Sequence, residues 1–202
     1  QYDLLLKVLP TSVTEGVPYF ENLKQMELAP LAGIHLWFDR PIECPPALAL
    51  LDRETEWIFN KTKNWNLPKG AGTYLSMVIS ASHRFAKTPK EELVRIVLED
   101  FHSALPASRE AKVVRSQVVR WPKATLVPPP GLEALRPDQR SPLTNLFVAG
   151  EWTNTGWPST MESAVRSGYR AAEGVLEAAG EPRSLAIAEL PVTGLARLLL
   201  RR

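Results

Sequence analysis

The chain has 202 residues, 45% of them hydrophobic and 23% charged, with a formal net charge of +2. This balance is typical of a soluble globular protein and excludes a disordered chain, and the small net charge gives no reason to expect a nucleic-acid partner. The single cysteine excludes an internal disulfide. The sequence begins with glutamine instead of methionine, and we interpret it as a fragment of a longer protein.

Residues 34–42 have the alternating pattern of a strand, with apolar side chains on one face and His35, Trp37 and Asp39 on the other. The second face mixes an imidazole, an indole and a carboxylate, so it is a candidate lining of a substrate cavity. His35 is the one catalytic candidate that the sequence offers. A partly solvated sheet face explains the same pattern.

Two further segments, 56–60 and 74–81, have strand patterns and together with 34–42 predict an antiparallel set, and 112–121 is predicted as one more strand. Aromatic residues accompany these segments and could line a cavity for a long hydrocarbon, although aromatic side chains more often form plain core. These residues are Trp57, Phe59, Trp65 and Tyr74.

A helix is predicted between the third and fourth of these strands. Thr88 is expected to be its N-cap, with Pro89 at the first helical position and Glu91 closing a capping box. Apolar residues recur at helical spacing as far as Leu105, and Pro106 ends the pattern.

One stretch organises the rest of the chain. Residues 146–149 are a short apolar run that predicts a buried strand of a parallel sheet, and Glu151 follows at its carboxyl end, where ligands of open α/β sheets bind. Ser159 and Glu162 have the spacing of a capping box, and a helix is predicted from there to a C-cap at Gly180. Its apolar face is expected to be Met161, Ala164, Val165, Gly168, Ala172, Val175, Leu176 and Ala179.

The predicted order of strand, loop and helix N-terminus has a chemical meaning. The first N–H groups of a helix are unpaired and carry a partial positive charge, which suits a phosphate or an electron-rich carbonyl. Glu151 could accept hydrogen bonds from sugar-like hydroxyls, and Gly150 would let a ligand approach the backbone. An ordinary strand–helix unit with a well-capped helix is the alternative. Glu162 and Arg166, one turn apart, are expected to pair and stabilise the helix.

The stretch from Thr144 to Gly180 resembles the C-terminal flavin motif of the amine oxidase and phytoene desaturase superfamily. Residues 34–42, 74–82 and 157–168 are most similar to the squalene-associated FAD-dependent desaturases, the hydroxysqualene dehydroxylases. The resemblance implies that Glu151 meets the ribityl chain of FAD and that the helix start meets the flavin edge. The implied cofactor-binding residues are Gly150, Glu151, Trp157, Pro158, Thr160 and Met161.

The fold class implied by this resemblance is α/β (α+β), as the C-terminal half of a two-domain FAD-dependent oxidoreductase. Residues 1–125 are expected to be part of the substrate-binding domain with its antiparallel sheet, and 126–180 the last strand and helix of a Rossmann-like FAD-binding domain. Residues 181–202 are expected to be a tail. The Gly-rich dinucleotide fingerprint is missing, since Gly70 and Gly72 lie in a turn without a third glycine. We therefore expect the 202 residues alone not to hold FAD and to be inactive.

The function implied is FAD-dependent oxidoreduction of a polyprenoid, with hydroxysqualene converted to squalene as the first candidate. A phytoene-type carotenoid desaturase or another amine-oxidase-like flavoenzyme is one alternative, and a non-catalytic fragment or partner subunit is another. The sequence has neither metal-ligand spacing nor a nucleophile triad, which fits a reaction carried by the cofactor. The expected location is cytoplasmic, with peripheral membrane contact through residues 195–202 as a possibility that a frayed tail explains as well.

Overall fold

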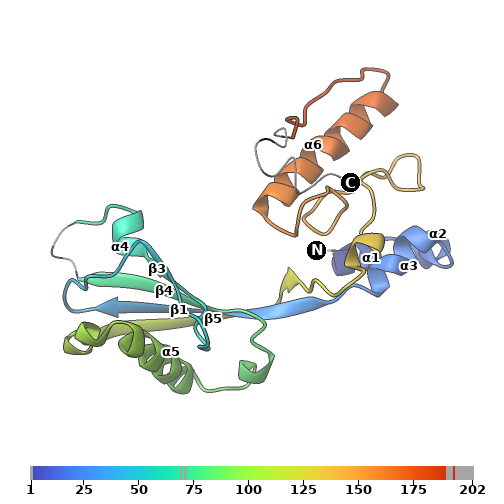
Figure 1. Ribbon diagram of the computed structural model, residues 1–202. Coiled ribbons are helices and arrows are strands. Elements are labelled where there is room, and N and C mark those ends of the chain that lie inside the picture. Colours follow the sequence, from blue (N-terminus) through green and yellow to red (C-terminus); the bar gives the residue numbers. More distant parts are fainter. Residues whose placement is uncertain (1, 69, 71, 190–192, 194–202) are drawn as a thin grey trace. The chain divides into compact units, whose positions relative to one another are not determined.

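The computed structural model describes residues 2–68, 70, 72–189 and 193. They divide into two compact units, of which one comprises residues 27–127 and the other combines 1–26 with 128–202 (Figure 1).

A five-stranded antiparallel sheet forms the unit 27–127. The strand order is β2-β3-β4-β1-β5, so the longest pairings lie at β1, between β4 and β5. The strands are β1 (Leu28–Phe38), β2 (Ala47–Ala49), β3 (Trp57–Asn60), β4 (Thr73–Ile79) and β5 (Val113–Leu126). With the helices of both units, this sheet confirms the predicted mixed fold class and the predicted antiparallel set.

The alternation predicted around Ile34 decides which face of the sheet is covered. Ile34, Leu36 and Phe38 are buried in one core cluster with Leu75 and Met77 of β4. The same cluster includes buried side chains of helix α5 (Lys90–Ala104), which lies along this face of the sheet (Figure 1). The opposite face of β1 carries His35 and Trp37, which are only partly buried.

Helix α5 begins one residue later than predicted. Its N-cap is Pro89, whose side chain makes no capping hydrogen bond, and the expected capping box at Thr88 is not formed. The unit also contains the short helix α4 (Lys61–Asn64), which the Asn60 side chain caps by accepting from the Lys63 N–H at 3.1 Å. Two 3₁₀ turns, η1 (His83–Phe85) and η2 (Pro106–Glu110), flank α5.

The second unit combines both ends of the chain. Its helices are α1 (Tyr2–Val8), α2 (Thr11–Thr14), α3 (Pro18–Lys24) and α6 (Met161–Ala178), with a 3₁₀ turn, η3 (Leu132–Ala134). The Tyr19 hydroxyl donates to the Asp138 carbonyl at 2.6 Å, and the Tyr2 ring meets Trp152 edge-on. Residues 1–26 therefore pack with the flavin-motif stretch, whereas the sequence-based division grouped them with residues up to 125.

The predicted strand at 146–149 is wrong. Within the described chain, this segment makes one isolated antiparallel bridge, between Phe147 and Arg140, and no strand of a sheet. A short apolar run becomes a strand only where a neighbouring strand offers backbone donors and acceptors. Here, within the described residues, the segment bonds only the residues just before it, since the Val148 N–H donates to the Gln139 carbonyl at 2.8 Å and the Leu146 carbonyl accepts from the Ser141 N–H at 3.2 Å. Beyond its end, the Gly150 N–H donates to the Ser167 hydroxyl of α6 at 2.7 Å.

Helix α6 was predicted at the right place but with the wrong cap and the wrong inner face. Thr160 is the N-cap, its hydroxyl accepting from the Ser163 N–H, so the box expected from Ser159 is not formed. The buried residues are Ser163, Ser167 and Gly174. The predicted apolar face is largely exposed, with Met161 at 88%, Val165 at 56% and Val175 at 49%.

Small side chains explain this inversion. A Cβ at Gly174 would lie 2.8 Å from the Phe147 ring, so glycine is what lets residue 147 reach the helix. The predicted pair of Glu162 and Arg166 is confirmed at 2.6 Å. After the helix, residues 185 and 186 donate their N–H groups to the Glu173 carboxylate, so the start of the predicted tail runs back along α6.

None of the described helices is both long and apolar enough to cross a membrane. The segment 195–202, for which membrane contact was considered, lies outside the described residues.

The division of the sheet into a covered and an open face gives a stability prediction. Leu36→Ala should lower the free energy of unfolding by ~2–5 kcal/mol, because it leaves a cavity under α5. Leu51→Ala is the matched control, since Leu51 is 85% exposed, and should change stability by less than ~0.5 kcal/mol. Denaturant unfolding measures both variants, and equal losses would contradict the assignment of the core.

Candidate functional site

The loop between Val148 and α6 has a backbone conformation that depends on glycine. Gly150 has φ +150°, and a Cβ there would collide with the Trp152 indole. Trp152 is buried, and the Thr153 hydroxyl donates back to the Gly150 carbonyl at 2.8 Å. The chain's own packing therefore requires glycine at this position, in addition to the ligand approach expected from sequence.

Glu151 leaves this turn with an unengaged carboxylate. Its main-chain carbonyl accepts hydrogen bonds from Arg136 and Ser163, but no hydrogen bond or ion pair of the described residues involves its side chain. A partly buried carboxylate without a protein partner can accept hydrogen bonds from hydroxyls of a ligand.

The start of α6 offers donors in the same unit. The helix has 18 residues, and its first backbone bonds to Thr160 are made by Ser163 and Ala164. The N–H groups of Met161 and Glu162 therefore precede the first helical bond and are available to an acceptor. A free acceptor and two free donors at a positive helix terminus suit a polyhydroxyl chain joined to an electron-rich ring edge, so these residues fit the flavin that the resemblance implies.

Arg136 joins Glu151 to the helix, and sequence reasoning missed it. Its side chain is 1% exposed. Its terminal nitrogens donate to the carbonyls of Trp157 at 2.7 Å, Glu151 at 2.8 Å and Thr153 at 2.6 Å, and to the Ser163 hydroxyl at 3.2 Å. The fixed fork of a guanidinium lets one side chain hold both ends of the loop and the first turn of α6.

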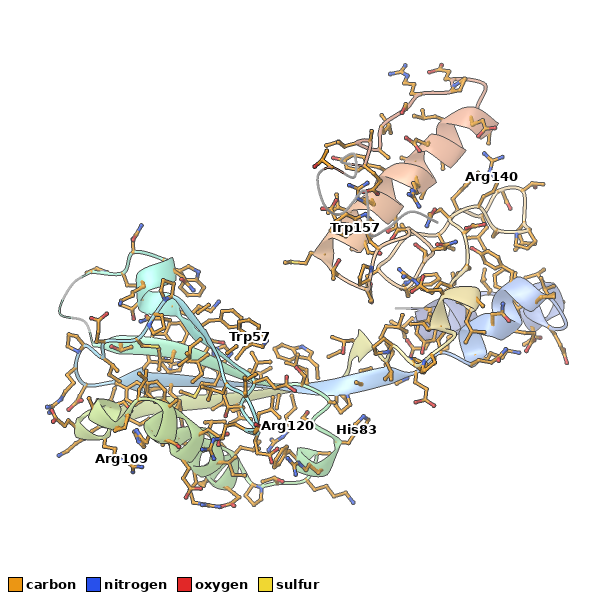
Figure 2. The ribbon with its side chains drawn as sticks, viewed as in Figure 1. Trp57, His83, Arg109, Arg120, Arg140 and Trp157 are labelled. Atoms are coloured by element: carbon orange, nitrogen blue, oxygen red, sulfur yellow. The ribbon has the colours of Figure 1, made fainter. Side chains whose placement is uncertain are left out.

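The other predicted cofactor residues lie at the loop's outer edge. Trp157 is close to the first turn of α6 (Figure 2), with Arg166 stacked 5.2 Å from its ring and its indole N–H donating to Glu189 at 2.8 Å. Pro158 and Thr160 are exposed, and the Thr160 hydroxyl donates to the Pro158 carbonyl at 3.1 Å. All six predicted residues therefore belong to one loop and helix start, within one unit.

His35 belongs to the other unit. It lies on the face of the sheet opposite α5, which we call the aromatic face because it carries Trp37 and Tyr74. Trp37 stacks on Tyr74, with 4.5 Å between ring centroids and 5° between planes, and the Arg115 guanidinium lies 4.6 Å from the Trp37 ring. The Tyr74 hydroxyl meets His35 Nδ1 at 2.9 Å.

The aromatic face continues onto β3 and the residue that follows α4. Trp57 and Phe59 stack at 5.9 Å, and Trp57 projects from the side of the sheet away from α5 (Figure 2). Trp65 meets Tyr74 edge-on at 5.8 Å, and Lys61 Nζ lies 5.2 Å from the Trp65 ring. The predicted alternative of a plain core is wrong for Trp57 and Trp65, which are exposed, whereas Phe59 and Tyr74 are partly buried.

The charge of His35 is set by this surrounding. Partial burial is the main cause that lowers the pKa of His35 below its ordinary value, and the positive charge of Lys61 lowers it further. Burial likewise raises the pKa of Tyr74, against the opposing effect of Arg115. Both groups are therefore neutral at pH 7, and His35 Nε2 has no hydrogen-bond partner among the described residues.

A family model matches most of the chain. The model described as flavin containing amine oxidoreductase matches residues 5–176. The chain belongs to this family. The match confirms the resemblance drawn from the flavin motif and the prediction of a flavin cofactor.

Two relatives show which members of the family this chain is similar to. The hydroxysqualene dehydroxylase of Sinorhizobium fredii (strain NBRC 101917 / NGR234) is 35% identical over 170 residues, which are 84% of this chain and 37% of that protein. A "Probable zeta-carotene desaturase" of Synechococcus elongatus (strain ATCC 33912 / PCC 7942 / FACHB-805) is 36% identical over an alignment of 184 positions that covers 79% of this chain and 37% of that protein. The chain thus spans little more than a third of the length of either relative.

A solved structure supports the fold. An oxidoreductase from Methanosarcina mazei superposes with a TM-score of 0.54 over 85% of this chain and 39% of its own, at 18% sequence identity. At this identity, the likeness concerns the fold alone.

The His35 environment predicts a titration. In NMR, the His35 ring should titrate below the ~6.5 of an ordinary histidine, and Lys61→Ala should move its midpoint upward because one nearby positive charge is removed. Because the folded-state pKa is the lower one, the stability that neutral His35 contributes is present above ~6.5 and lost as pH falls through the folded value. Lys87→Ala, at an exposed lysine outside the aromatic face, is the control, and a midpoint at or above 6.5 in the parent protein would contradict the assignment.

Proposed function

We propose that this chain forms part of an FAD-dependent oxidoreductase that acts on a polyprenoid, and that its reaction is the reductive removal of the hydroxyl group of hydroxysqualene to give squalene. The aromatic face carries this proposal, because an open row of stacked rings on a stable sheet suits a long hydrocarbon. The names of the relatives support the substrate class, since one is a hydroxysqualene dehydroxylase at 35% identity.

The cofactor side of the proposal rests on the loop and helix start. Glu151 would hold the ribityl chain, and the N–H groups at Met161 and Glu162 the flavin edge. Gly150, Trp157, Pro158 and Thr160 shape that loop, while residues outside these 202 would hold the pyrophosphate and adenosine. When bound, FAD supplies the hydride chemistry.

His35 is the proposed polar contact on the substrate side. Its Nδ1 is engaged by Tyr74, which fixes the ring and leaves Nε2 to meet a substrate hydroxyl. In the dehydroxylation, a bound reduced flavin would supply the hydride that replaces the hydroxyl group on carbon, and His35 Nε2 would contact that hydroxyl, which would take a proton and leave as water. An aromatic face with one free imidazole nitrogen can hold such a hydroxyl while the rest of the substrate stays on apolar rings.

A carotenoid desaturase is the second candidate, because a relative named for that activity is 36% identical. Desaturation removes hydrogen from a pure hydrocarbon and has no leaving hydroxyl. The two candidates therefore differ in the substrate's polar group and in the direction of electron flow.

Substrate turnover separates these candidates. With the complete flavoprotein that contains this chain, we expect squalene from hydroxysqualene when the flavin is kept reduced, and no flavin reduction by primary amines or polyamines. Gas chromatography of the extracted products measures the first, and anaerobic absorbance at the flavin band measures the second. Conversion of phytoene or zeta-carotene without squalene formation would support the desaturase instead, and reduction by amines would refute both.

Glu151 gives a direct test of the cofactor site. Glu151→Ala should weaken flavin retention by ~1.5–3 kcal/mol, the usual size of a hydrogen bond to a charged group. Flavin remaining after dialysis, compared across a dilution series, measures the loss. Glu177→Ala is the matched control, because that carboxylate bonds Arg140 near the far end of α6 at 2.6 Å. Unchanged flavin occupancy in the Glu151 variant would remove Glu151 from the proposal.

A further inference from the structure

We propose that Arg136 is a positioning residue that sets Glu151 and the N-terminus of α6 for the flavin, an inference that rests on the proposed function. Three facts carry it: the depth of the guanidinium, the identity of its acceptors and the weakness of its ion pairing. None of these depends on a bound ligand.

The acceptors of Arg136 are the parts of the chain that would meet the flavin. Its Nη2 donates to the main-chain carbonyl of Glu151, the residue that carries the free carboxylate, and to the Ser163 hydroxyl in the first turn of α6. Its Nη1 donates to the carbonyl of Trp157, three residues before Thr160, the N-cap of α6. The spacing between Glu151 and the free helical N–H groups is therefore set through one side chain.

Main-chain carbonyls, more than a counter-ion, hold this buried charge. Among the described residues, the one carboxylate in contact is that of Glu133, 3.0 Å from Nη1, and the Glu133 side chain is 67% exposed. An exposed partner stabilises a buried charge only weakly, because water screens it. A guanidinium that loses its carbonyls would be a buried, poorly paired charge, so the loop conformation and the Arg136 position depend on each other.

The third guanidinium nitrogen of Arg136, Nε, shows that the side chain is oriented to bond the loop. Arg136 Nε is buried without a hydrogen-bond partner among the described residues. A buried donor left unpaired is a cost that folded proteins seldom carry, and such exceptions concentrate at functional sites. The side chain satisfies its two terminal nitrogens at the expense of Nε, which is the orientation that reaches Glu151, Thr153, Trp157 and Ser163 together.

Ser163 forms a second connection between the loop and α6. Its hydroxyl meets the Thr155 hydroxyl at 2.7 Å and lies 3.4 Å from the Glu151 carbonyl, and Ser163 is fully buried. The loop is thus tied to the helix by one charged and one neutral side chain, both meeting at Glu151. Removing either should misplace the Glu151 carboxylate without removing it.

The test is a double-mutant cycle between Arg136 and Glu151 in the complete flavoprotein that contains this chain. The folded apoprotein of each variant is titrated with FAD, and flavin fluorescence gives the dissociation constant. Arg136→Lys keeps the charge but not the fork, and we expect at least a tenfold weaker constant together with a changed visible spectrum of the bound flavin. In the Arg136→Lys background, Glu151→Gln should have little further effect, because a misplaced carboxylate no longer contributes.

Two further variants make the outcome decisive. Ser163→Ala is a smaller change, and it serves as the test if Arg136→Lys does not fold. In the Ser163→Ala background, Glu151→Gln should also have a weaker effect on FAD binding than in the parent protein. Arg140→Lys is the matched control and should leave the constant unchanged, since Arg140 is a half-exposed arginine of the same unit that bonds Glu177.

The cycle also separates this inference from the function on which it rests. Additive effects of the Arg136 and Glu151 substitutions, or native affinity and spectrum in folded Arg136→Lys, would overturn the positioning role while leaving Glu151 as a flavin ligand. No effect of Glu151→Gln in the parent protein would overturn the proposed cofactor site itself.

Discussion

The alternation of β1 is the constraint on which the sheet unit depends. Because neighbouring residues of a strand point to opposite faces, a strand that buries Ile34, Leu36 and Phe38 under α5 must present His35 and Trp37 on the other side. Pairing of β1 with β4 then brings Tyr74 beside Trp37. A shift of one residue would exchange the faces, so the hydrophobic core and the aromatic face are specified together.

The second unit is organised by polar contacts instead. Helix α6 turns two serines and a glycine inward, and the loop before it is held by the buried guanidinium of Arg136. Such a unit gains less from apolar burial, and its geometry depends on each hydrogen bond being satisfied. It suits a place where backbone groups must be held at fixed positions for a ligand, whereas the sheet unit suits a broad apolar contact.

Sequence reasoning succeeded where one periodic pattern decided the structure. The helical spacing before Pro106 located α5 to within one residue at its start. The period of two in 34–42 found β1 and its inner face but not its bounds, because the strand runs from Leu28 to Phe38. Periodicity failed at α6, because it shows which residues are apolar but not which face the rest of the chain covers. The run 146–149 has the composition of a strand, yet a strand also needs a partner, and composition carries no information about that.

Arg136 could not be found from sequence for a different reason. Three of its acceptors are main-chain carbonyls, which every residue carries, so the partners of a buried arginine leave no trace in side-chain pattern. Its place in a proline-rich connection suggested only a loop. Ser163 gave a faint signal, since a hydroxyl in the first turn of a helix often serves the cap. The sequence reveals the chemistry of the flavin motif, but the support beneath it becomes visible only in the structure.

The difference between the apolar sheet unit and the polar loop-and-helix unit also bears on the reaction proposed above. A reaction carried by a flavin needs little acid–base chemistry from the protein. On the aromatic face, partial burial and the positive charge of Lys61 lower the pKa of His35 and keep it neutral. Removal of a hydroxyl requires a place where oxygen is tolerated on an otherwise apolar surface, whereas desaturation of a hydrocarbon does not. The pairing of His35 with Tyr74, with Nε2 left without a partner among the described residues, therefore supports the hydroxylated substrate proposed above.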